Sequence, residues 1–215
     1  MVDIKRIEKR TVQYFYEDGL NEIALGLIFL LLGGYFFAQA AIPEGSPLNA
    51  MLSVLFVFVI ISSGFLVSRF IRYFKRRITY PRTGYVAFKK KKPNPKRRAA
   101  VVITSGLIGA SLAALYTLSP ALKALFPALN GLLFAVAIFF IANKVGLVRF
   151  HVLAAASAAI GVVVTTSGVG DIKGVSLYYG LFGAAMVVSG LAALIVYLRR
   201  SPRPEAGDTE GPDAH

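Results

Sequence analysis

The sequence predicts an all-α integral membrane protein: a six-helix transmembrane bundle with an N-terminal interfacial amphipathic helix and a small β-hairpin between the second and third membrane helices. Two features of the whole chain lead to this fold class. Hydrophobic residues make up 56% of the 215 residues and charged residues only 16%, against about 45–50% and about 25% in soluble domains. The charges also fall in blocks, which leaves nearly uncharged runs long enough to cross a bilayer.

Residues 1–17 are expected to form a cytoplasmic helix that lies in the membrane interface. Apolar side chains recur there at helical spacing, at Ile4, Ile7, Val12 and Phe15. Most of the basic residues of this segment fall on other faces, as in interfacial amphipathic helices. Asp18 and Gly19 end this helix, and the Asp18 side chain can cap the membrane helix that follows.

Six apolar runs are predicted to cross the membrane, since about 20 helical residues span a hydrocarbon core of about 30 Å. They are Leu20–Ile42, Ala50–Phe70, Ala99–Leu118, Ala121–Ala142, Val148–Val169 and Val175–Leu198. The chain from Ala99 to Ala142 would make a single helix of about 66 Å, so we place a break at Ser119 and Pro120. The domains are therefore residues 20–70 (spans one and two), a basic loop at 71–98, residues 99–198 (spans three to six) and a disordered cytoplasmic tail at 199–215.

The distribution of basic residues predicts the orientation. With six spans, 22 of the 24 Lys and Arg residues lie on one side of the membrane, and only Lys123 and Lys173 lie on the other. The positive-inside rule then places both termini in the cytoplasm. We expect the protein to be integral to the inner or plasma membrane of a cell.

The basic loop is interpreted as a topology-setting segment that also engages anionic headgroups or a partner. Residues 69–98 contain 13 basic and no acidic residues, and such juxtamembrane clusters attract anionic lipid. No nucleic-acid-binding module accompanies the charge, so nucleic acid is not an expected partner. The predicted contact residues are Arg72, Lys75, Arg76, Arg77, Arg82, Lys89, Lys90, Lys91 and Lys92.

A small hairpin is predicted at residues 78–88 of this loop. Two β-branched and aromatic runs, Ile78–Tyr80 and Tyr85–Phe88, flank the turn sequence "PRTG". The residues expected to form the turn and to anchor it at headgroup level are Tyr80, Pro81, Gly84, Tyr85 and Phe88.

Ionisable residues within membrane spans are candidate functional groups, because burying their charge is costly. Glu22 and Arg149 each lie in the first turn of a predicted span, at the cytoplasmic interface, and we expect them to form an ion pair. No catalytic motif is present, the chain has no cysteine and only two histidines, and we expect no cofactor, metal site or catalytic residue.

Uncharged polar residues support an alternative. Those predicted for the outer half of the bundle are Gln39, Asn130, Thr165, Thr166 and Ser167, and Pro127 with Asn130-Gly131 is expected to kink or unwind the fourth span. Broken helices of this kind coordinate substrates in transporters; ordinary interhelical hydrogen bonding explains the same residues. Small residues at four-residue spacing, such as Ser157 and Gly161, predict close helix packing and are compatible with a homo-oligomer.

The leading hypothesis is thus a multi-pass membrane protein, not an enzyme, whose basic cytoplasmic loop engages anionic lipid or a partner. A small transporter or channel that uses the outer polar cluster is the alternative, and a membrane-embedded enzyme comes third. A water-filled path past Gln39, Asn130 and Thr166 would distinguish a channel or transporter from a packed bundle.

Overall fold

The computed structural model describes residues 13, 16–43, 45–79 and 120–200. In these ranges the chain consists of helices joined by short turns, with no strand. The long helices are α2 (Leu20–Ala41), α3 (Pro47–Phe74), α6 (Pro120–Val145), α7 (Val148–Thr166) and α8 (Asp171–Arg200), and a π-helical turn, η1 (Lys75–Thr79), continues α3.

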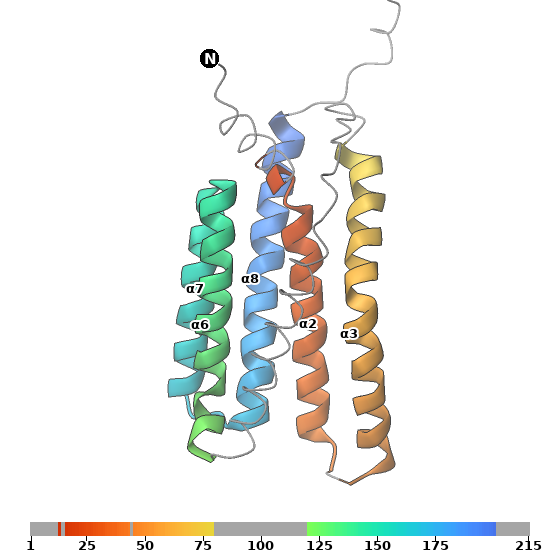
Figure 1. The fold of residues 1–215 in the computed structure, drawn as a ribbon, viewed down its shortest axis with the longest axis vertical. Coiled ribbons are helices and arrows are strands. Elements are labelled where there is room, and N and C mark those ends of the chain that lie inside the picture. Colours follow the sequence, from red (N-terminus) through yellow and green to blue (C-terminus); the bar gives the residue numbers. More distant parts are fainter. Residues whose placement is uncertain (1–12, 14–15, 44, 80–119, 201–215) are drawn as a thin grey trace, which may run out of the picture.

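The helices lie side by side with α8 in the middle. Figure 1 shows α6 and α7 on one side of α8, α2 on the other, and α3 at the outer edge beside α2. Helices α2 and α7 begin at the same end of the bundle at which η1, α6 and α8 finish. We call this the basic end, because Lys144, Arg149, Arg199, Arg200 and the basic residues of α3 and η1 lie there; the opposite end is the far end.

All five long helices of the described chain are long enough and apolar enough to cross a membrane. Their outer surfaces are apolar as well: Phe58 is 67% exposed, Ile61 74% and Phe140 70%. None of the residues of α3 from Pro47 to Phe74 is buried. A water-soluble protein rarely exposes so much contiguous apolar surface, whereas lipid chains cover it at no cost. The described fold is therefore compatible with a multi-pass membrane protein.

The closest helix contact is between α2 and α8, along a seam of glycines. Gly19, Gly26 and Gly33 recur every seven residues at the start and along one face of α2, and Gly183 and Gly190 face them from α8. A Cβ atom built on Gly26 would lie 2.8 Å from the carbonyl oxygen of Gly183. Because hydrogen alone fits between the two backbones, the helices approach as small residues allow in membranes.

Helices α6 and α7 form a second tight pair. The Cα atoms of Gly131 and Gly161 face each other, and a Cβ built on either would lie 2.9 Å from the other Cα. Ser157 Oγ in α7 donates to the carbonyl of Gly131 over 2.9 Å and is also 2.9 Å from the hydroxyl of Tyr178 in α8. Aromatic side chains then join this pair to α2, since the Phe29 ring packs edge-on against Phe134 and Phe182.

The described helices agree closely with the predicted spans. The first, fourth and fifth predicted spans differ from α2, α6 and α7 by at most three residues at either end, whereas α3 and α8 extend beyond theirs by three or four residues at one end or both. The third predicted span, Ala99–Leu118, lies outside the described residues, so a count of six helices stays a prediction. The predicted interfacial helix at 1–17 also lies mostly outside; Gln13, Tyr16 and Glu17 of it are described, and they are helical.

Two local predictions differ from the structure, one of them in only one of its alternatives. Ile78 and Thr79, predicted as part of the first arm of the hairpin, lie in the π-helical turn η1. The helical chain continues from α3 through η1 to Thr79, whose hydroxyl donates to Asp18. The rest of the predicted hairpin lies outside the described residues. The fourth span was expected to be kinked or unwound, and the unwinding is contradicted, because α6 runs without a break through Pro127. The N–H of Ala128, next to that proline, donates to Thr165 Oγ1 in α7 over 2.9 Å, and such a bond from a neighbouring helix lets a membrane helix tolerate proline.

Candidate functional site

Two buried carboxylates, Asp18 and Glu22, lie at the basic end, and each is paired with a basic side chain. Asp18 precedes α2, and its side chain is 1% exposed. Its Oδ2 lies 3.1 Å from Lys75 Nζ and accepts a hydrogen bond from Thr79 Oγ1 over 3.1 Å, while its Oδ1 accepts from the N–H of Leu20 over 3.2 Å. The Lys75 side chain is itself only 5% exposed. This carboxylate therefore ties the end of α3 to the start of α2.

The predicted pair of Glu22 and Arg149 is brought together at the same end. Arg149 Nε of α7 lies 2.8 Å from Glu22 Oε1 of α2 and forms an ion pair with it. The two atoms do not meet the geometry of a hydrogen bond. Ser189 Oγ of α8 donates to Glu22 Oε2 over 2.9 Å. The remaining Arg149 nitrogens donate to the backbone carbonyls of Tyr16 and Glu17. One arginine thus connects α7, α2 and the segment before α2.

The energetics of these pairs favour a structural role. Removing one partner of a buried ion pair leaves an uncompensated charge and costs about 3–5 kcal/mol. Asp18 and Glu22 are the carboxylates held by these pairs, and each is 1% exposed. They fix the relative positions of α2, α3 and α7 at one end of the bundle. The interpretation of Lys75 as a lipid contact is consequently wrong, because its ammonium group is buried against Asp18.

Other basic residues at this end are exposed. Arg72 and Arg76, both predicted contacts, lie on the surface, as does Arg69, which the sequence analysis left out. Arg72 Nε donates to the carbonyl of Ser68 over 3.1 Å. Arg77 is exposed too, and its Nη1 donates to the Tyr73 hydroxyl over 2.9 Å.

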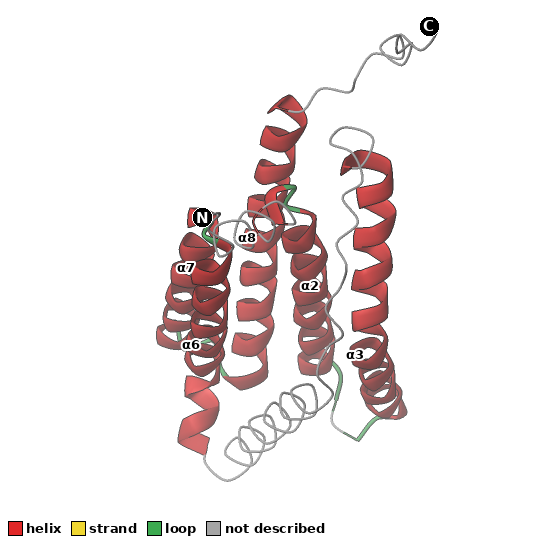
Figure 2. Cartoon of the chain, turned by 45° about the horizontal axis from the view of Figure 1, so that its top comes forward, coloured by secondary structure: helices red, strands yellow, loops and turns green. Residues whose placement is uncertain are grey.

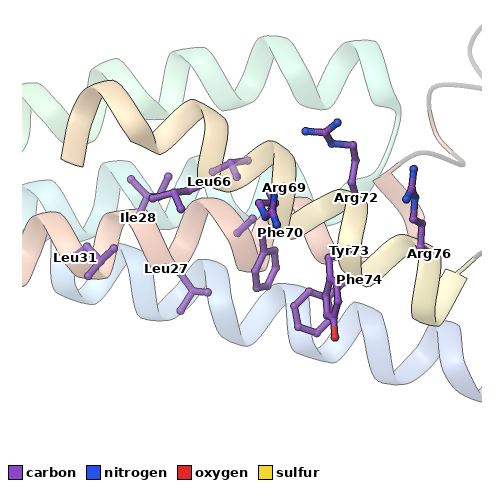
Figure 3. A pocket seen from close by; sticks show the side chains of 12 residues that line it. Leu27, Ile28, Leu31, Leu66, Arg69, Phe70, Arg72, Tyr73, Phe74 and Arg76 are labelled. Atoms are coloured by element: carbon purple, nitrogen blue, oxygen red, sulfur yellow. The ribbon is translucent and has the colours of Figure 1, made fainter. Parts of the chain in front are cut away.

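Arg69, Arg72 and Arg76 border a groove between α2 and α3, with a volume of about 620 Å³. We call it the α2–α3 groove. Its apolar lining from α2 comprises Ala24, Leu27, Ile28 and Leu31. Its lining from α3 includes Leu66, Val67, Phe70, Tyr73 and Phe74. In Figure 3 the rings of Phe70, Tyr73 and Phe74 extend to one side of α3 and the guanidinium groups of Arg72 and Arg76 to the other. Apolar side chains line the inside of the groove, and Arg69, Arg72 and Arg76 stand at its edge, with the guanidinium groups of Arg72 and Arg76 directed away from the rings. An apolar interior with basic residues at the edge has the chemistry to accommodate an amphiphile.

No hydrogen bond in the described structure joins one of the predicted outer polar residues to another. Asn130 Oδ1 accepts from the Tyr179 hydroxyl over 3.2 Å, and Asn130 Nδ2 donates to the carbonyl of Phe126 in its own helix. Thr165 accepts from the N–H of Ala128, as described above. Thr166 and Ser167 are exposed and donate to carbonyls of α7, and Gln39 lies half-buried near the end of α2. Interhelical and intrahelical hydrogen bonds account for four of these five side chains.

The remaining predicted contacts and anchors lie outside the described residues. They are Arg82, Lys89, Lys90, Lys91 and Lys92 of the basic loop, and Tyr80, Pro81, Gly84, Tyr85 and Phe88 of the hairpin. Within the described ranges, no three His, Cys, Asp or Glu side chains are grouped so that they could hold a metal ion. Comparisons of the chain with protein-family models, curated proteins and solved structures found no match.

Sequence reasoning missed three participants for identifiable reasons. Ser189 and Thr79 contact the carboxylates from distant parts of the chain, and neither has a local signal. Arg69 stands at the point where the uncharged stretch of α3 ends, three and seven residues before Arg72 and Arg76. That spacing places the three arginines on neighbouring positions of one helix face. It could have identified Arg69 as a member of the same basic group as Arg72 and Arg76.

Proposed function

We propose that this chain is a multi-pass protein of a cell's inner or plasma membrane, without enzymatic activity, whose basic end engages the anionic headgroups of membrane lipids. In this proposal six helices cross the bilayer, and both termini and the basic end are cytoplasmic. A single observation carries the lipid interaction. With the exception of Lys173, the exposed basic residues of the described chain gather at one end of the bundle: Arg69, Arg72, Arg76, Arg77, Lys144, Arg199 and Arg200.

The strength of the attraction follows from general electrostatics. Each Lys or Arg near an anionic membrane surface contributes about 1 kcal/mol, and salt screens the interaction over about 8 Å at physiological ionic strength. The far end offers only Lys123 and Lys173 among described basic residues, with Asp171 two residues before Lys173. The two ends therefore differ strongly in their attraction for anionic lipid.

The direction of the helices supports an even number of crossings. Helix α3 with η1 ends at the basic end, and α6 begins at the far end (Figure 1). A chain that leaves at one end and re-enters at the other has to pass between them, and the uncharged stretch Ala99–Leu118 lies in this interval. This reasoning favours six spans over five.

The test measures which lipids surround the protein. The full chain is reconstituted in phosphatidylcholine bilayers with a trace of spin-labelled phosphatidylglycerol or spin-labelled phosphatidylcholine, and the motionally restricted fraction of each is measured. We expect phosphatidylglycerol to be enriched beside the protein at low salt and to lose that advantage at 1 M salt, where the Debye length falls to about 3 Å. Equal restricted fractions of the two lipids at low salt would overturn the proposal.

A further inference from the structure

We propose that the α2–α3 groove is a discrete binding site for one anionic phospholipid, with an acyl chain inside the groove and the phosphate at Arg69, Arg72 and Arg76. The inference rests on the proposed function. It replaces a general attraction between the basic end and anionic lipids by a single site that binds one lipid per chain. The occupant is a lipid whose headgroup carries a phosphate.

The groove exists because α2 uses opposite faces for its two neighbours. Its glycine face is held against α8. The groove residues Leu27, Ile28 and Leu31 recur at helical spacing, and at about 100° per residue their stripe lies roughly 150° around the helix from Gly26. Close packing on α8 thus leaves the other face of α2 open toward α3.

Helix α3 is held to α2 on either side of the groove. Toward the far end, the rings of Tyr35 and Phe56 stack with their centroids 4.1 Å apart. At the basic end, Lys75 and Thr79 bind Asp18. Between these two attachments α3 has no buried residue, and the groove occupies part of this interval. Two fixed ends with a space between them make a preformed site, which reduces the entropy lost on binding.

The position of the groove along α3 matches the membrane surface. The span Pro47–Thr79 has 33 residues, or about 50 Å, against a hydrocarbon core of about 30 Å. Its charge-free part ends at Ser68, after about 33 Å, so Arg69 stands at headgroup level. Leu66 and the apolar residues of α2 then lie at acyl-chain depth, while Tyr73 lies where aromatic rings are favoured.

Charge complementarity identifies the headgroup as anionic. Of the carboxylates at the neighbouring helix end, Asp18 and Glu22 are already paired with Lys75 and Arg149. Glu17 is exposed and is the one remaining acid among the described residues there, against three rim arginines. The three rim arginines therefore keep a net positive field, and they are exposed. Guanidinium groups recognise phosphate oxygens with two parallel hydrogen bonds, and their aliphatic stems allow the charged heads to reach the interface.

The experiment is a lipid titration of the full chain in mild detergent, followed by native mass spectrometry, with dioleoylphosphatidylglycerol and dioleoylphosphatidylcholine as probes. We expect one phosphatidylglycerol to bind before any further lipid does, and phosphatidylcholine to bind more weakly. The variant with Arg69→Gln, Arg72→Gln and Arg76→Gln should bind that first lipid on the order of 100-fold more weakly, since each basic residue near the headgroup strengthens binding about fivefold.

A matched control removes the same number of charges from the same end, with Lys144→Gln, Arg199→Gln and Arg200→Gln, and should keep the first binding step. If both triple variants weaken binding equally and no first lipid is distinguished, the discrete site is refuted while the proposed function stands. If neither variant changes phosphatidylglycerol binding, both the site and the proposed function fail.

A second variant pair tests the acyl-chain position. Leu66→Trp fills the groove and should weaken the first binding step about tenfold, whereas Ile61→Trp, on exposed surface of the same helix, should not. If another part of this chain occupies the groove, Leu66→Trp lowers the unfolding temperature and leaves the titration unchanged. That outcome would contradict the proposal.

Discussion

Gly26→Ala should destabilise the bundle, because the seam between α2 and α8 has no room for a methyl group. A Cβ at this position would lie 2.8 Å from the carbonyl oxygen of Gly183 and 2.9 Å from the backbone nitrogen of Val187. Both are backbone atoms, so relief requires that the helices separate. Forcing an extra carbon into a packed interface costs about 1–3 kcal/mol, whereas alanine gains about 1 kcal/mol over glycine in helix propensity.

Gly34→Ala is the matched control, since it makes the same substitution in the same helix. A Cβ on Gly34 would meet nothing within 4 Å. The propensity gain is common to both variants, so the difference between them isolates the steric term of about 1–3 kcal/mol. At about 2–4 °C per kcal/mol for a chain of this size, Gly26→Ala should unfold roughly 2–12 °C below Gly34→Ala. The assay is thermal unfolding in mild detergent, followed by circular dichroism. Equal unfolding temperatures would refute the glycine seam.

Three further predictions use the same assay. Lys75→Met should cost about 3–5 kcal/mol, because it leaves the buried Asp18 carboxylate without its partner, and adding Asp18→Asn should recover most of the loss; a double variant as unstable as the single one would contradict the buried pair. Ser157→Ala should cost about 1–2 kcal/mol through its two lost hydrogen bonds, and an unchanged unfolding temperature would mean that these bonds contribute nothing. Thr165→Val removes the acceptor of the Ala128 N–H at nearly constant volume and should cost about 1 kcal/mol; a neutral result would show that the helix tolerates its proline without this bond.

The bounds of the membrane helices could be predicted because they depend on local sequence. Pro43 and the charges after Ser68 interrupt apolar runs directly, and α2 and α3 begin or end near them. Glu22 and Arg149 also meet as expected, because each lies in the first turn of a helix that starts at the same end of the bundle. The lengths of the apolar runs and the side of the membrane on which each run begins were enough to predict the helix bounds and this ion pair.

Partner choice was harder to predict because it depends on how the helices are arranged around one another. Gly26 and Gly33 lie on one face of α2, but nothing in the sequence of α2 indicates that α8 is the partner of that face. Lys75 was grouped with the exposed basic residues by composition alone, and its burial against Asp18 depends on how α3 packs beside α2. Of the two outcomes expected at Pro127, a kink or an unwound turn, the unwound turn is absent for the same reason, since the compensating hydroxyl of Thr165 comes from another helix.

The central claim is that the basic end of the bundle faces the cytoplasm and the far end faces outward. The chain has no native cysteine, so single cysteines can be labelled in intact cells with a membrane-impermeant maleimide without background. We predict that Lys173→Cys, in an exposed position at the far end, is labelled in intact cells, and that Lys144→Cys and Arg200→Cys are labelled only after permeabilisation. Labelling of Lys144→Cys in intact cells, or the same accessibility at Lys144 and Lys173, would contradict the account.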